Sequence, residues 1–174
     1  SFGQETSSRN SEVVHAGLYY SPGSLKAKLC VEGRRALYRY CDENNVEYSK
    51  CGKLLVATTG KEVSSLRDIH RVALENGVDD LEIVSRVDVS TRFGEAGVLC
   101  TEALFSPSSG AVDSHGFMSS MARDITSHGG MISYNTRVIG GTLHTDTVSG
   151  TPTHVLDMED SHSGSVTRVS CRHV

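Results

Sequence analysis

Three segments of the chain carry apolar residues at helical spacing. The first is expected to form a helix over Leu25–Asn44, where the Ser24 hydroxyl is placed to accept a hydrogen bond from the first free amides. The second helix is expected over residues 61–76, and the third begins at residues 113–114 and is stopped by the glycine pair at 129–130. The spacing therefore predicts three amphipathic helices joined by short connections.

The same spacing predicts which side of each helix faces the core. The inward residues of the three helices are expected to be, in chain order, Leu25, Leu29, Ala36, Leu37, Tyr40 and Cys41, then Val63, Leu66, Ile69 and Ala73, then Phe117, Met118, Met121, Ala122 and Ile125. Gly77 is placed to take the left-handed conformation after the second helix.

Shorter apolar runs bounded by Gly, Ser, Pro and Asp predict strands. The run at 53–58 suits a strand that is covered on both faces, and the charged stretch before residue 98 has no clear period and is expected to be irregular. Further strands are predicted at 81–84, 98–105, 131–134, 136–143, 153–158 and 166–171. Helices and strands mix in the first half and antiparallel strands dominate the second, which predicts an α+β (mixed α/β) fold.

Composition narrows the class of protein. The 174 residues suffice for one domain, whose core is thin because only 37% of residues are hydrophobic and 6% aromatic. Basic and acidic residues, 17 and 21, are mixed along the chain, so there is no basic stripe for nucleic acid. The five cysteines form no CxxC pair and favour reduced thiols in an intracellular protein, and no membrane span or secretion signal is predicted.

Three places in the chain contain candidate chemistry, each with a structural alternative. Residues 6–11 are dense in hydroxyl, amide and guanidinium groups that suit phosphate or flavin oxygens, although composition alone favours a frayed terminus. His15 is a candidate general base or a hydrogen-bonded structural residue, and His115 a candidate site residue or, more in keeping with Asp113 beside it, part of a helix cap. The other histidines lack metal-ligand spacing, so no metal is predicted.

Common catalytic motifs are missing from these residues. The chain has no GxGxxG or GxxxxGK[ST] loop, no GxSxG elbow and no cysteine in a nucleophile context. The chemistry of the residues alone therefore supports only an intracellular mixed α/β domain.

Three stretches in the same order carry a family resemblance: TSSRNSEVVHAGLYYSPGSLKAKLCVEGRRALYRYC, CGKLLVAT and SPSSGAVDSHGFM. They resemble FAD-dependent oxidoreductases of the L-2-hydroxyglutarate dehydrogenase and oxidase type, in the D-amino-acid-oxidase-like flavoprotein superfamily. The similarity extends to about Gly141. Such proteins begin with a strand, a GxGxxG turn and a helix that hold FAD.

The resemblance implies a piece of a two-domain flavoprotein, with a Rossmann-like FAD domain and a substrate domain, that lacks the N-terminal βαβ unit. Both ends look cut, so 1–174 is expected to be a single incomplete domain. Within it, residues 1–45 would form the flavin strap and the following helix, 46–128 strands and helices of the substrate domain, and 129–174 mostly antiparallel strands.

The resemblance also implies roles for single residues. His15 corresponds to a histidine near the isoalloxazine and is expected to be the base or to orient the substrate. Val138 falls where such folds hold adenine by backbone hydrogen bonds. The residues expected to bind substrate are Tyr19, Tyr20, Lys26 and His115, and those expected to bind FAD with Val138 are Thr6, Ser7, Ser8, Arg9, Asn10 and Ser11. A solvated Lys26 on a capped helix is an equal alternative to one that pairs with a substrate carboxylate.

The implied reaction is FAD-dependent oxidation of a 2-hydroxy acid, similar to 2-hydroxyglutarate, to the 2-oxo acid. The 174-residue chain alone is expected to be inactive, and the electron acceptor is left open. The alternative is a non-catalytic binding or interaction module derived from a flavoprotein substrate domain. A mitochondrial location is implied for a eukaryotic source and a cytoplasmic one otherwise.

Overall fold

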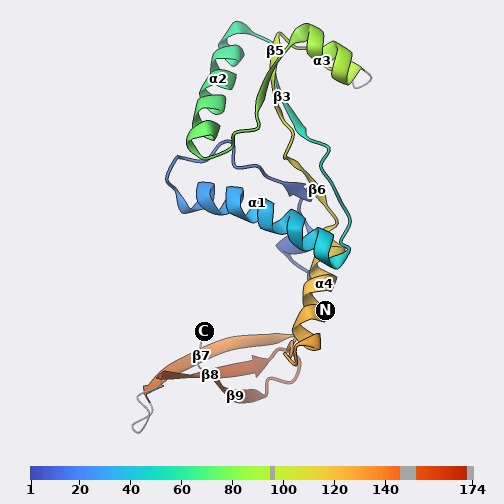
Figure 1. Ribbon diagram of the computed structural model, residues 1–174. Coiled ribbons are helices and arrows are strands. Elements are labelled where there is room, and N and C mark those ends of the chain that lie inside the picture. Colours follow the sequence, from blue (N-terminus) through green and yellow to red (C-terminus); the bar gives the residue numbers. More distant parts are fainter. Residues whose placement is uncertain (95–96, 146–151, 172–174) are drawn as a thin grey trace. The chain divides into compact units, whose positions relative to one another are not determined.

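The computed structural model describes residues 1–94, 97–145 and 152–171, and the chain divides into two compact units (Figure 1). The larger unit is Gly3–Arg123, and the smaller comprises Ser1–Phe2 and Asp124–Val174. The mixture of helices with antiparallel strands confirms the predicted fold class.

Helix α1 (Leu25–Asn44) of the larger unit has the predicted bounds and the predicted cap, because the Ser24 hydroxyl accepts a hydrogen bond from the Ala27 amide. The predicted inward face is mostly wrong: Cys41 is buried and Leu37 and Tyr40 are half-buried, but the other three predicted residues are exposed. Leu25 and Leu29 are 70% and 55% exposed. The buried side of the helix instead carries Ala27, Val31, Arg34, Tyr38 and Cys41. The buried side includes the polar side chains of Arg34 and Tyr38, so apolar spacing alone did not indicate it.

A three-stranded antiparallel sheet forms the main core of the larger unit. Its strand order is β3 (Lys53–Ala57), β5 (Glu102–Ser106), β4 (Glu82–Ser85). Helix α2 (Gly60–Glu75) packs through Leu66 against Ala57 and Leu104 on one face. Helix α3 (Arg86–Phe93) packs through Val89 against Val84 and Ala103, a separate group of core residues. Figure 1 shows α2 and α3 on either side of β3 and β5, as expected for a strand covered on both faces.

Helix α2 confirms the prediction within a residue at each end. Thr59 and Glu62 form a capping box at its N-terminus, and Gly77 has a φ of +82° at its C-terminus. Helix α3 corrects the expectation of an irregular segment. Ser85 caps this helix by accepting a hydrogen bond from the Asp88 amide, a short local signal that the missing apolar period concealed.

A smaller antiparallel sheet lies beside α1 in the larger unit. Strand β6 (Gly110–Val112) is its centre, with β1 (Val13–Val14) on one side and β2 (Tyr48–Ser49) on the other. Helix α4 (Ser114–Ser127) follows β6 directly, which confirms the predicted helix start. The strand predicted at 98–105 is shorter, since β5 begins at Glu102.

The smaller unit contains a meander of three antiparallel strands. They are β7 (Thr136–Thr145), β8 (Pro152–Asp160) and β9 (Val166–Cys171), paired in chain order. The prediction of antiparallel sheet in this half is confirmed, except that residues 131–134 form no strand. None of the residues of these strands is buried.

Candidate active site

His15 follows β1 directly and is held at the surface by its neighbours. Val13 and Val14 pair with Ala111 and Gly110 of β6, and Val14 and Ala16 are buried on both sides of the histidine. Alternation along an extended chain then turns the imidazole of His15 outward. The apolar residues around His15 therefore anchor the backbone and leave the imidazole accessible.

The loop after His15 is fixed by a residue that the sequence did not single out. The side-chain amide of Asn76, at the C-terminus of α2, donates hydrogen bonds to the carbonyl oxygens of Gly17 and Tyr20, at 3.2 and 2.8 Å. Gly17 has a φ of +99°, and a Cβ there would collide with Val31. The loop is thus pinned to both α1 and α2.

This loop lines a narrow crevice together with Lys53 and Ser109. The residues around the crevice are His15, Ala16, Gly17, Leu18, Tyr19, Tyr20, Lys53 and Ser109. None of them is acidic. The Lys53 ammonium lies 5.0 Å from the centre of the Tyr19 ring. A histidine and a lysine therefore line the same narrow crevice, although 38 positions separate them in the sequence.

The turn that carries Ser109 is braced by α1. Ser109 and Ser106 hydroxyls are 2.9 Å apart and both residues are buried. The buried guanidinium of Arg34 donates to the Ser108 hydroxyl, and the Tyr38 hydroxyl donates to the Ser108 carbonyl oxygen at 3.1 Å. Burial raises the pKa of Tyr38, which keeps it a donor at neutral pH. One wall of the crevice is therefore rigid.

Residues 6–11 form a compact turn with outward side chains. The 3-10 helix η1 (Thr6–Ser8) is closed by the Asn10 amide, which donates to the Thr6 and Ser7 carbonyl oxygens at 3.2 and 2.9 Å. The Ser8 hydroxyl donates to the Glu5 carbonyl oxygen. Within the described residues, the side chains of Thr6, Ser7, Arg9 and Ser11 make no hydrogen bond or ion pair with the protein. Asn10 and Ser8 shape the turn, and four polar side chains remain available.

The remaining predicted residues lie at different places. Tyr19 and Tyr20 line the crevice, whereas the Lys26 ammonium lies 4.6 Å from the centre of the Tyr20 ring and does not line it. Burial, followed by the nearby Cys30 thiol, raises the pKa of Tyr20. Val138 is an exposed residue of β7 in the smaller unit.

His115 lies in the first turn of α4 with its side chain exposed. The Asp113 carboxylate beside it accepts a hydrogen bond from the Gly116 amide at 2.9 Å. The Glu12 carboxylate accepts from both the amide and the hydroxyl of Ser114. The helix cap that the sequence suggested is therefore present at this position.

Sequence reasoning missed three residues of the site: Lys53, Ser109 and Asn76. A signal existed for Lys53, because period-two alternation places it on the same strand face as Leu55. Nothing local marked Asn76 or Ser109, because Asn76 bonds to Gly17 and the Ser109 carbonyl oxygen accepts from the Gly52 amide, both distant in the sequence. Among the residues that the structure describes, no cluster of His, Cys, Asp or Glu could hold a metal ion, and no helix is long and apolar enough to cross a membrane.

Comparisons with known proteins agree on one family. The family model described as FAD dependent oxidoreductase matches residues 1–172. The mitochondrial L-2-hydroxyglutarate dehydrogenase of Arabidopsis thaliana is 47% identical over 121 residues, which cover 70% of this chain and 25% of that protein. L-2-hydroxyglutarate dehydrogenase of Escherichia coli K12 is 39% identical over 135 residues, covering 78% and 31%. The chain thus spans about a quarter to a third of the length of these relatives.

Solved structures share the fold at lower identity. Dithionite-reduced L-α-glycerophosphate oxidase from Mycoplasma pneumoniae superimposes with a TM-score of 0.75 at 22% identity, over 93% of this chain and 42% of that one. Glycine oxidase from Geobacillus kaustophilus gives 0.69 at 18%, over 92% and 42%. With the family model matching 172 of 174 residues, the chain belongs to the FAD-dependent oxidoreductase family.

Proposed function

We propose that the protein containing these residues uses FAD to oxidise a 2-hydroxy acid similar to L-2-hydroxyglutarate to the corresponding 2-oxo acid. The observation that carries the proposal is the exposed imidazole of His15, held on a braced loop in a crevice that also contains a lysine. Relatives named for this activity are 38–47% identical to the chain.

The donor set of residues 6–11 fits the flavin cofactor. Thr6, Ser7 and Ser11 offer hydroxyl groups, Arg9 offers a guanidinium, and none of these is used within the described residues. Hydroxyl, guanidinium and backbone donors are the groups that bind phosphate and flavin oxygens. We assign Thr6, Ser7, Ser8, Arg9, Asn10 and Ser11 to FAD, with Ser8 and Asn10 maintaining the turn. Val138 is proposed to contact the adenine through its backbone.

His15 is proposed to take the proton of the substrate hydroxyl on a ring nitrogen. An imidazole is suited to this step because its ordinary pKa lies near neutral pH. FAD, when bound, supplies the acceptor for the hydride that leaves the substrate carbon. The protein has to hold that carbon in one orientation and keep the imidazole neutral before the reaction.

The remaining proposed substrate contacts are Tyr19, Tyr20, Lys26 and His115. Tyr19 and Tyr20 line the crevice and present both a ring and a hydroxyl. A mitochondrial location is proposed if the source is eukaryotic, since the relatives from Arabidopsis thaliana and Nematostella vectensis are named mitochondrial.

The proposal is tested on the complete gene product purified with its flavin. We expect L-2-hydroxyglutarate to bleach the flavin absorbance without oxygen, and an artificial electron acceptor to support turnover. The variant His15→Asn should retain FAD and lose about 10²- to 10⁴-fold in kcat, because the proton acceptor is removed. A colourless protein, or a yellow protein that no 2-hydroxy acid reduces, contradicts the proposal.

A further inference from the structure

Lys53 reaches the crevice because of its position on β3. Successive side chains of a strand alternate between the two faces of a sheet. Leu54 packs with the core cluster around Val89, whereas Leu55 packs with the clusters around Ala16 and Leu104. Lys53 shares the face of Leu55, so it extends that face toward the loop that carries His15. The strand therefore directs the lysine into the site.

The surroundings of Lys53 favour an anion. The side chain is half-buried, and no residue around the crevice is acidic. Within the described residues, Lys53 belongs to no ion pair. The ammonium lies against the Tyr19 ring, which partly replaces its hydration. A partly desolvated cation without a carboxylate partner binds a carboxylate favourably.

The braced wall beside Lys53 adds a second polar group. Lys53 pairs with Ser106 across the sheet, and the Ser106 hydroxyl lies 2.9 Å from that of Ser109. The Gly52 amide, directly before Lys53, donates to the Ser109 carbonyl oxygen at 3.0 Å. The backbone at Lys53 is thus fixed to the same turn that lines the crevice, which limits the positions that the ammonium can take.

We propose that the Lys53 ammonium binds the substrate carboxylate on the carbon that carries the reacting hydroxyl. In a 2-hydroxy acid these two groups are on adjacent carbons, so their protein partners must also be neighbours. Lys53 and His15 line one crevice, whereas Lys26 does not line it. The inference rests on the proposed function and names Lys53, and not Lys26, as the residue that binds the carboxylate beside the reacting carbon.

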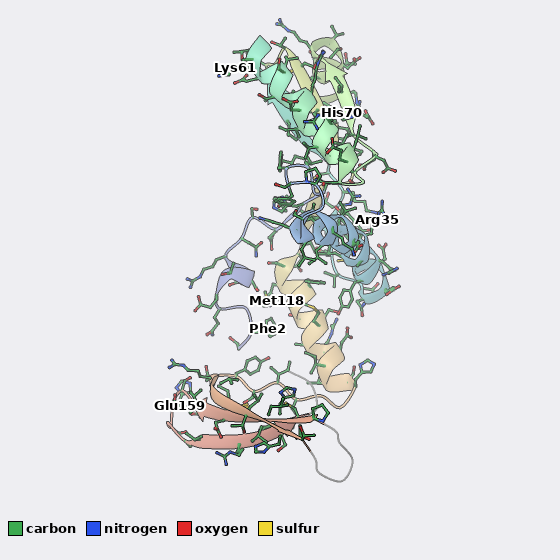
Figure 2. The ribbon with its side chains drawn as sticks, turned by 90° about the vertical axis from the view of Figure 1, so that its left-hand side faces the viewer. Phe2, Arg35, Lys61, His70, Met118 and Glu159 are labelled. Carbon is green, nitrogen blue, oxygen red and sulfur yellow. The ribbon has the colours of Figure 1, made fainter. Side chains whose placement is uncertain are left out.

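The test compares Lys53→Met, Lys53→Arg and Lys26→Met in the complete flavin-containing protein. The matched control is Lys61→Met, which removes an exposed lysine of α2 (Figure 2). The first readout is the dissociation constant of 2-oxoglutarate, measured from the change in flavin absorbance. The second is kcat/KM for L-2-hydroxyglutarate and for L-lactate, which lacks the distal carboxylate. Flavin content and melting temperature monitor folding in each variant.

Lys53→Met is expected to weaken 2-oxoglutarate binding and to lower kcat/KM for both substrates about 10- to 100-fold, since a charged hydrogen bond is lost. Lys53→Arg should recover most of this loss, and Lys61→Met should equal the wild type. Lys53→Met should mainly raise KM and leave kcat nearly unchanged, because the lysine binds the carboxylate equally in the ground state and the transition state.

Three results overturn the assignment while leaving the proposed function intact. They are unchanged binding in Lys53→Met, a loss confined to the dicarboxylate, and a loss found only in Lys26→Met. If Lys53→Met loses flavin or stability, Lys53→Arg decides the question. A folded, flavin-containing Lys53→Arg that binds 2-oxoglutarate no better than Lys53→Met also overturns the assignment, because it retains the positive charge. A wild-type protein that neither binds 2-oxoglutarate nor oxidises any 2-hydroxy acid contradicts the proposed function itself, and this inference with it.

Discussion

The sheet β3–β5–β4 and the sheet β7–β8–β9 have the same number of strands and the same antiparallel pairing, yet they are packed in opposite ways. In the first, Ala57, Ala103, Leu104 and Ser106 are completely buried. In the second, no residue of the three strands is buried. Strand pairing alone therefore says little about how firmly a sheet holds its side chains.

The exposed sheet nevertheless carries most of its large apolar residues on one face. The register places apolar residues on one face, namely Val138, Leu143, Leu156, Met158 and Val169. The opposite face carries Arg137, Asp157, Glu159 and Arg168, and the Arg168 guanidinium contacts the Asp157 carboxylate at 2.8 Å. Surface ion pairs of this kind contribute little to stability. The first sheet is thus held by packing and the second mainly by its backbone hydrogen bonds.

The comparison explains where the candidate site lies. His15, Lys53 and Ser109 all belong to the larger unit, which contains the packed sheet, and each is fixed through a buried neighbour. A site that orients a small molecule needs such support, because small displacements of its groups reduce the rate.

The largest expected difference between the two sheets is the stability lost when a leucine is truncated to alanine. Leu104→Ala removes a side chain with 0% exposure and should lower the free energy of unfolding by about 2–5 kcal/mol, since it leaves a cavity. Leu143→Ala, the matched change in β7, removes a side chain that is 64% exposed and should cost less than about 0.5 kcal/mol. Urea denaturation of the 174-residue chain measures both. Equal costs would show that the two sheets are packed alike.

A smaller difference in stability is expected when a strand glycine is replaced by alanine in each of the two units. A Cβ at Gly110 would collide with the Ser49 carbonyl oxygen and the Tyr38 hydroxyl, so Gly110→Ala should cost about 1–3 kcal/mol. Gly140→Ala places its Cβ 3.6 Å from the Asp157 carboxylate, an ordinary contact, and should change stability by less than about 1 kcal/mol. Thermal melts of both variants test this. A tolerated Gly110→Ala would mean that β2 can move away from β6.

The smallest expected difference concerns pH. Hydrogen bonds from the Thr58 hydroxyl and backbone lower the pKa of Glu62, and those from the Ser163 backbone and hydroxyl lower the pKa of Asp160. A lowered pKa contributes stability above the ordinary values of 4.5 and 3.8, and this stability is lost as the pH falls through the folded-state pKa.

Glu62→Gln should therefore flatten the pH dependence of global unfolding below pH 4.5, because Glu62 caps a helix of the packed sheet. Asp160→Asn should alter only the local amide exchange of the β8–β9 turn. Hydrogen exchange between pH 3 and 6 distinguishes the two. A global effect of Asp160→Asn would show that the exposed sheet unfolds together with the packed one.

Local sequence signals were sufficient to predict the bounds of several helices and strands. The Ser24 cap and Gly77 set helix ends within a residue, and β9 has its predicted bounds, because caps and turns depend on neighbours in the sequence. The inward face of α1 was predicted wrongly, since both sides of that helix carry apolar residues and only its packing partners distinguish them. Helix α3 was missed because its single buried residue, Val89, gives no period.

The sequence by itself determined the family, through the ordered stretches around His15 and Lys53 that the family model and the relatives bear out. It also determined that residues 6–11 are rich in polar donors. Only the tertiary structure brought Lys53 and Ser109 to the crevice of His15 and pinned the loop with Asn76. The reason is physical: each of these contacts joins residues more than 30 positions apart, and folding of the core decides which distant segments meet.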